Sequence, residues 1–201
     1  MITVLIAEDQ AMVRGAIASL LGLEDDIEVV AEVGRGDDAV DRARTLRPGV
    51  ALLDIEMPGL DGLAAAAELA RELPETRTLI LTTFGRPGYL RRAIETGVGG
   101  FMLKDAPADQ LADAIRQVNA GARVIDPGPA ADAIADGVSP LTEREHDVLA
   151  AAATHATAAE IAASLYLSEG TVRNYLSAAI RKLGARNRAE ALRIAEEKGW
   201  L

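Results

Sequence analysis

Residues 50–63 read VALLDIEMPGLDGL, and this stretch decides the fold. Its first four residues are apolar without alternation, which is typical of a strand buried on both faces of a parallel sheet. The run ends at the carboxylate of Asp54, and a Met-Pro-Gly turn at 57–59 separates it from the next helical pattern. A buried strand that leads through a short loop into a helix is the repeating unit of a doubly wound α/β sheet.

The same unit recurs along the first 120 residues, where short apolar runs alternate with amphipathic stretches. The expected strands are Thr3–Ala7, Glu28–Val33, Val50–Asp54, Thr78–Thr83 and Gly99–Leu103. The expected helices lie at 11–21, 37–46, 62–72, 88–96 and 108–120. Strands that alternate with helices form a parallel sheet covered on both faces. Residues 1–120 therefore predict a five-stranded, doubly wound, flavodoxin-like α/β domain.

The remaining residues predict a linker and a small helical domain. Residues 121–138 contain glycine and proline without a sustained period, and their alanine-rich middle can form a helical turn. Residues 139–201 carry helix-start signals instead. Thr142, Thr157 and Asn187 each precede a glutamate by three positions, which is the capping-box pattern, and Ser168 is an N-cap without the box. The four expected helices are 142–153, 157–164, 168–183 and 187–198.

Composition and charge narrow the function. The absence of cysteine among 201 residues excludes disulfides, thiolate metal sites and cysteine nucleophiles, and it fits a reducing cytoplasm. Net charge is −10, yet the stretch 168–188 holds five basic residues and one acidic residue, as a small DNA-reading element requires. The apolar run 2–7 is too short for a signal peptide, and no stretch is long enough to span a membrane. We expect a cytoplasmic protein without a membrane partner.

Polar side chains stand at the expected carboxyl ends of four strands. They are Glu8, Asp9, Asp54, Thr82 and Lys104. Ligands of parallel sheets bind at this edge, and carboxylates that converge there repel one another unless a cation intervenes. Mg²⁺ prefers such oxygen ligands, and a carboxylate can attack phosphorus to give an aspartyl phosphate. A single residue of this kind is commonly a solvated strand end, but five together favour a phosphoryl-transfer site.

These features resemble the receiver domain of the response-regulator family over residues 1–120. The resemblance rests on Glu8-Asp9, on Asp54 followed by Met57-Pro58-Gly59 and Asp61-Gly62, on Leu81-Thr82-Thr83, and on Gly100-Phe101-Met102-Leu103-Lys104. It implies that Asp54 accepts a phosphoryl group, which Thr82 and Lys104 contact. It also implies that Thr82 and Phe101 form a conformational switch. The implied Mg²⁺ ligands are Asp9, Asp54 and the backbone carbonyl of Glu56, with Glu8 acting through water.

The second and third expected helices of the C-terminal domain have helix-turn-helix spacing, because only residues 165–167 separate them. Apolar residues at helical spacing give the later helix, 168–183, one buried face. The opposite face carries Arg173, Asn174 and Ser177, which we expect to reach base edges in the major groove. The residues expected to contact phosphates are Thr171, Tyr175, Arg181, Lys182 and Arg188.

The C-terminal motifs resemble the LuxR-type effector domain, and a receiver joined to such a domain is the NarL/FixJ class. The motifs are Leu141-Thr142, Arg144-Glu145, Glu160-Ile161-Ala162, Ser168, Thr171-Val172-Arg173-Asn174 and Lys182-Leu183. Further motifs, among them 54–59 and 197–200, resemble a regulator of a membrane-lipid desaturase response. The class implies a transcription regulator rather than an enzyme. Its implied partners are a sensor histidine kinase, double-stranded promoter DNA, RNA polymerase and, on phosphorylation, a second copy of the chain.

The resemblance places the dimer surface on the first and fifth helices, at 10–22 and 107–120. Leu20, Leu111 and Ile115 are either contacts on that surface or core residues. Two other functions stay open. An enzyme that forms an acyl phosphate on a free substrate lacks a substrate-pocket motif and an added catalytic base. A DNA binder with a degenerate receiver is disfavoured by the intact set of polar residues at the strand ends.

Overall fold

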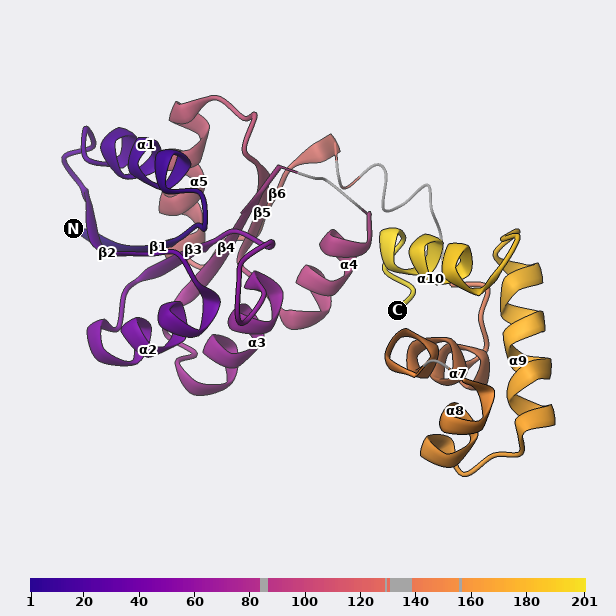
Figure 1. The fold of residues 1–201 in the computed structure, drawn as a ribbon. Coiled ribbons are helices and arrows are strands. Elements are labelled where there is room, and N and C mark those ends of the chain that lie inside the picture. The colour runs from indigo at the N-terminus through magenta and orange to yellow at the C-terminus, as the bar shows by residue number, and fades with distance from the viewer. Residues whose placement is uncertain (84–86, 129, 131–138, 156) are drawn as a thin grey trace. The chain divides into compact units, whose positions relative to one another are not determined.

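The computed structural model describes residues 1–83, 87–128, 130, 139–155 and 157–201 (Figure 1). These residues divide into two compact units, one formed mainly by residues 1–130 and the other mainly by the residues from 139 onward. The helical turn expected in the alanine-rich middle of the linker falls largely outside the described residues.

The N-terminal unit is a parallel sheet with helices on both faces. Its strands are β1 (Ile2–Ala7), β2 (Ile27–Val33), β3 (Val50–Leu53), β4 (Arg77–Thr82), β5 (Gly100–Leu103) and β6 (Val124–Ile125). Its helices include α1 (Ala11–Leu21), α2 (Gly36–Leu46), α3 (Gly62–Glu72), α4 (Pro87–Thr96) and α5 (Ala108–Asn119). The strand order is β2-β1-β3-β4-β5-β6, and every pair is parallel. The expected flavodoxin-like α/β fold is confirmed.

The sixth strand was not expected, because residues 121–138 were predicted to be a linker. Strand β6 holds only two residues, which is too short for any periodicity to register. It forms because the Val124 amide donates to the Gly99 carbonyl and the Asp126 amide donates to the Phe101 carbonyl, both at 3.0 Å. The edge of β5 thus recruits the chain that follows α5, and the sheet has five main strands plus this short one.

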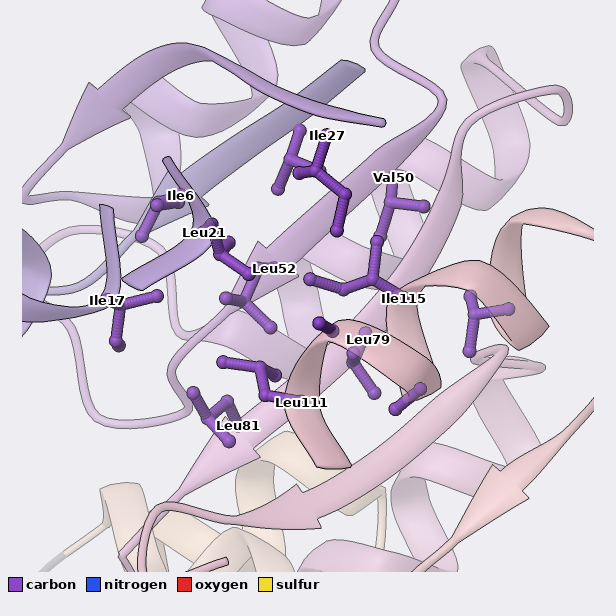
Figure 2. Close-up of a cluster of buried hydrophobic side chains, with 14 of the residues drawn as sticks. Ile6, Ile17, Leu21, Ile27, Val50, Leu52, Leu79, Leu81, Leu111 and Ile115 are labelled. Atoms are coloured by element: carbon purple, nitrogen blue, oxygen red, sulfur yellow. The ribbon is translucent and has the colours of Figure 1, made fainter. Parts of the chain in front are cut away.

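Helices α1 and α5 cover one face of the sheet and share a hydrophobic core cluster with it (Figures 1 and 2). Alternate residues of β1, β3, β4 and β5 point into this cluster, where each buried aliphatic side chain contributes about 1.5–3 kcal/mol. Leu111 and Ile115 of α5 are 7% and 0% exposed and belong to it. The core alternative therefore holds for these two residues, whereas Leu20 is 43% exposed and stays available as a contact.

The C-terminal unit has four helices, α7 (Glu143–Thr154), α8 (Ala158–Leu165), α9 (Glu169–Lys182) and α10 (Arg188–Glu197), among the residues described. Closed capping boxes begin α7 and α8, and the Ser168 hydroxyl accepts from the Thr171 amide at the start of α9. These boundaries agree with the helix-start signals in the sequence. The four-helix, all-α architecture is confirmed.

The third capping box does not close as expected. Asn187 accepts from the Glu190 amide at 2.9 Å, but the Glu190 carboxylate bonds the backbone amide and guanidinium of Arg186. The Arg186 guanidinium and amide hold the pKa of Glu190 down at about 2. A charged neighbour competes more strongly for this carboxylate than the neutral amide of Asn187. Helix α10 therefore starts with a single N-cap bond.

Candidate phosphorylation site and DNA-binding face

The carboxyl edge of the sheet gathers the expected site residues from four strands. Glu8 and Asp9 follow β1, Asp54 follows β3, Thr82 ends β4 and Lys104 follows β5. The Asp54 amide still donates to the Ala7 carbonyl at 2.9 Å, so backbone pairing with β1 fixes the residue although the strand ends one position earlier than expected.

Glycine at position 62 allows α3 to begin directly beneath Asp54. A Cβ atom there would lie 1.9 Å from the Asp54 carbonyl oxygen, which no side chain can tolerate. The Asp61 carboxylate accepts from the Ala64 amide at 2.7 Å and caps the same helix. The Asp61-Gly62 pair therefore sets where the Asp54 loop meets α3.

The Lys104 ammonium lies between two buried carboxylates. Its Nζ is 2.5 Å from Glu8 Oε2 and 3.1 Å from Asp54 Oδ2. Glu8 is 2% exposed and Asp54 is 5% exposed, so both acids are almost removed from water. The Ile55 amide donates to Asp54 Oδ1 at 2.9 Å and leaves the other oxygen on the Lys104 side.

The electrostatic balance of this cluster is negative. Burial raises the pKa of Asp54, and the negative charge of Glu8 adds to this effect. The hydrogen bond and positive charge of Lys104 lower the same pKa, but the net direction is upward from the usual value. One ammonium does not neutralise two buried carboxylates, so the cluster is suited to accept a further cation.

Glu8, Asp9 and Asp54 fit a divalent metal ion. Each offers a carboxylate oxygen, and these oxygens lie within 4.8 Å of one another. Asp9 is exposed, so the cluster opens to solvent on its side. Mg²⁺ is bound in this manner, by one or two carboxylates with water in its other positions. The Glu56 side chain is exposed, and the role of its backbone carbonyl stays a prediction.

Thr82 and Phe101 lie on the same face of the sheet. Ile80 pairs with Phe101 and Thr82 with Leu103, so Thr82 and Phe101 are diagonal neighbours on adjacent strands. Their face is opposite to the cluster under α1 and α5, which contains Leu79, Leu81 and Met102 instead. Thr82 is 1% exposed and Phe101 is fully buried. The proximity allows a coupled movement, and the switch role itself stays a prediction.

Arg14 is a site residue that the sequence analysis missed. Its Nη1 donates to the backbone carbonyl of Glu8 at 2.5 Å, so α1 holds the turn that carries Glu8 and Asp9. The bond joins residues six positions apart across a loop-to-helix junction, and no periodic signal predicts that geometry.

Helix α9 buries one side and presents the other. Val172 and Ala179 are fully buried, whereas Arg173, Asn174 and Ser177 are exposed. Arg173 forms an ion pair with Glu169 one turn earlier in the helix. The residues expected to read bases therefore do share the exposed face of α9, and their contacts with DNA stay predictions.

Three residues expected to contact phosphates also have partners within the C-terminal unit. Lys182 Nζ is 2.6 Å from Glu145 Oε2 and connects α9 to α7. Arg188 donates to the carbonyl of His155 at 3.3 Å, and Tyr175 packs partly against the hydrophobic cluster around Val172. Thr171 and Arg181 stand on α9 without such a long-range contact among the described residues.

Burial would raise the pKa of Glu145, but hydrogen bonds from Lys182 and from the Thr142 amide outweigh it and leave the pKa below its usual value. Glu145 is 6% exposed, and it thus acts both in the cap of α7 and as the partner of Lys182. The capping pattern revealed the first role of Glu145. The second role depends on how α7 packs on α9 and left no local signal.

Comparison with known proteins agrees with this architecture. Residues 4–116 match the family described as response regulator receiver domain, and residues 139–195 match bacterial regulatory proteins of the luxR family. The chain is 48% identical to the transcriptional regulatory protein DesR of Bacillus subtilis over 202 residues, covering 100% of this chain and 99% of DesR. It is also 48% identical to the transcriptional regulatory protein YvfU of the same organism over 201 residues, covering both chains fully.

A solved structure of the response regulator ChrA, from a heme-sensing two-component system, gives a TM-score of 0.61 at 32% identity and covers 100% of this chain and 98% of ChrA. The sheet, its acidic carboxyl edge and the helix-turn-helix unit together define a two-component response regulator with a DNA-binding output. The chain belongs to the NarL/FixJ class of this family, which joins a receiver to a LuxR-type domain and consists of transcription regulators rather than enzymes. Among the described residues, no helix is long and apolar enough to cross a membrane.

Proposed function

We propose that Asp54 accepts a phosphoryl group from the phosphohistidine of a sensor histidine kinase in the cytoplasm. An Asp54 carboxylate oxygen attacks phosphorus, the P–N bond to the histidine breaks, and the imidazole leaves with the bonding pair and takes up a proton. The observation that carries this proposal is the buried Asp54 carboxylate beside Lys104 and within reach of two further acids.

Each side chain at the edge has a role in this reaction. Lys104 is placed to offset the charge on the transferred phosphoryl group. The Thr82 hydroxyl would donate a hydrogen bond to one of the phosphoryl oxygens. Asp9 and Asp54, with the Glu56 carbonyl and with Glu8 acting through water, would hold Mg²⁺. When bound, Mg²⁺ would neutralise negative charge that otherwise keeps an anionic donor away. Inward movement of Thr82 would then free space for Phe101, which is the switch.

The output of the switch is promoter binding. We propose that phosphorylation joins two chains through the surface on α1 and α5, so that two copies of α9 read promoter DNA and influence RNA polymerase. On α1 the exposed apolar residues Met12 and Leu20 support an interface there. The motif resemblance to a regulator of lipid desaturation, together with the 48% identity to DesR, makes membrane-lipid genes the regulon we propose.

The direct test is to incubate the whole protein with Mg²⁺ and acetyl phosphate and to measure its mass. A single added phosphate that hydroxylamine removes is expected, because an acyl phosphate is cleaved by that nucleophile. Omission of Mg²⁺ is the control and should suppress the adduct. A protein that never gains the adduct, with this donor or with a phosphorylated kinase domain, has a degenerate receiver, and the proposal is then wrong.

Replacing Arg173 with alanine is expected to relax base preference at one position of the binding site and to cost about 1–3 kcal/mol on the preferred sequence. Arg173 is exposed on the face of α9 that we propose enters the major groove, where arginine commonly reads guanine. Arg181→Ala is the matched control, since loss of a phosphate contact weakens binding to all sequences alike. Selection from random duplexes, followed by titration, distinguishes the two patterns. Equal losses on all sequences for Arg173→Ala would assign it to phosphate instead.

A further inference from the structure

Tyr166 combines two features that folding does not explain. It is the C-cap residue of α8. Its φ of 55° and ψ of 44° lie in the left-handed region, which L-residues other than asparagine and aspartate rarely adopt. Its side chain is also 97% exposed, more than any other large hydrophobic side chain of the described residues. A tyrosine in this conformation costs about 1 kcal/mol or more relative to glycine, and its ring recovers none of it by packing.

The backbone at this position does have a structural task. The Tyr166 amide donates to the Ala162 carbonyl and ends α8, and the Leu167 amide donates to the same carbonyl at 2.9 Å. Glycine or asparagine would perform this task with less strain. Leu167 packs against the hydrophobic cluster of the unit, but Tyr166 does not. The aromatic side chain therefore requires an explanation outside the folded unit.

Tyr166 lies two residues before the N-cap of α9, at the N-terminal end of the proposed recognition helix. The first residues of a recognition helix are the ones that enter the major groove. Groups that can donate hydrogen bonds to a phosphate lie at this end. The hydroxyls of Ser168 and Thr171 are 2.8 Å apart, and the first turn of α9 has the amide groups and positive dipole end that attract anions. A side chain that projects from the turn beside them reaches the sugar–phosphate backbone rather than the base edges.

We propose that Tyr166 is a DNA-backbone contact. Its ring packs on a deoxyribose at the edge of the groove that α9 enters, and its hydroxyl donates to a phosphate oxygen. The residue positions α9 and reads no base. This inference rests on the DNA-binding role of the luxR-type domain and adds a residue outside the two helices of the motif. The backbone strain at Tyr166 is tolerated because, between α8 and α9, only a residue of the turn can direct its side chain away from the folded unit.

The substitution that separates folding from binding is Tyr166→Asn. Asparagine tolerates the left-handed conformation, so the thermal midpoint of the variant is expected to equal or exceed that of the parent. DNA affinity is expected to fall about five- to tenfold, by the same factor on a duplex selected from a random pool and on an unrelated duplex of equal length. Tyr166→Phe keeps the ring and loses only the hydroxyl, and about a two- to threefold loss is expected.

The measurements use the full chain. Unfolding is followed by the fluorescence of Trp200, the only tryptophan of the chain, which lies in the same unit. Parent-like DNA affinity of Tyr166→Asn would overturn the proposal, and so would a loss confined to one base position. A loss of transcription with unchanged DNA binding would assign Tyr166 to a protein partner and equally overturn it. If Tyr166→Asn unfolds, unaltered affinity of Tyr166→Phe decides against the hydroxyl contact. A parent that binds no duplex would refute the proposed function itself.

Discussion

Replacing Asp54 with asparagine is expected to abolish the hydroxylamine-sensitive phosphate adduct while leaving the protein folded. The change keeps the size of the side chain and removes only the anionic nucleophile. Asparagine can still accept the Ile55 amide bond that orients Asp54, so the loop geometry is retained. Mass measurement after treatment with acetyl phosphate and Mg²⁺ reports the loss. Asp126→Asn, in a half-buried carboxylate after β6, is the matched control and should be phosphorylated like the parent. If another acidic residue of the Asp54→Asn variant gains the same adduct at the same rate, Asp54 is not the phosphoryl acceptor.

The same variant is expected to be more stable than the parent without metal, by on the order of 1 kcal/mol. Burial raises the pKa of Asp54, so the ionised carboxylate destabilises the folded protein. Below the unfolded-state pKa both proteins carry a neutral group there and differ little. As pH rises through the folded pKa, the parent loses stability and the variant does not. Thermal unfolding from pH 4 to 8 measures this difference, and added Mg²⁺ should reduce it. An Asp54→Asn protein that is less stable at neutral pH would contradict the electrostatic picture.

The sequence predicted the sheet because its signals are local. Apolar runs, turn residues and caps lie within a few positions of the structure that they specify, as Asp61-Gly62 does at the start of α3. The carboxyl-edge site also followed from sequence, since parallel strands bring their ends together whatever the details of packing. The strand order itself was not needed for that inference.

What the sequence did not predict depends on contacts between distant residues. Strand β6 exists because β5 offers a free edge, and Lys182 faces Glu145 because α9 packs on α7. The Arg186 ion pair that displaces the third capping box has a helical spacing of four, but its competition with Asn187 depends on backbone geometry. The left-handed turn at Tyr166 could not be predicted for a different reason. Glycine and asparagine are the residues that indicate such a turn, and tyrosine is not.

Phosphorylation is expected to raise affinity about 100-fold or more for DNA with two half-sites, and to change affinity for one half-site little. One helix-turn-helix reads a few base pairs, and residues 139–201 carry as many acidic as basic side chains. Non-specific attraction of a single unit is therefore small at cellular salt. In a dimer, binding of the first α9 places the second at high effective concentration over its half-site. This gain requires half-sites about one DNA turn apart, near 34–36 Å.

The interface can be tested on the same duplexes. Leu20→Glu places a charge on α1 and should prevent the phosphorylated protein from dimerising, with loss of the two-site gain and unchanged phosphorylation. Leu46→Glu is its matched control, because Leu46 of α2 is 42% exposed and Leu20 is 43% exposed, but Leu46 lies away from α1 and α5. Sedimentation with and without acetyl phosphate measures the dimer, and a duplex with the half-sites moved by half a turn tests the spacing. The mechanism would be refuted by a phosphorylated protein that stays monomeric and binds one half-site tightly. It would also be refuted if Leu46→Glu lost dimerisation as Leu20→Glu does. Most of the free energy that favours a two-site promoter comes from joining two C-terminal units that each bind DNA weakly. A switch in the receiver therefore needs to alter only the association of the two chains.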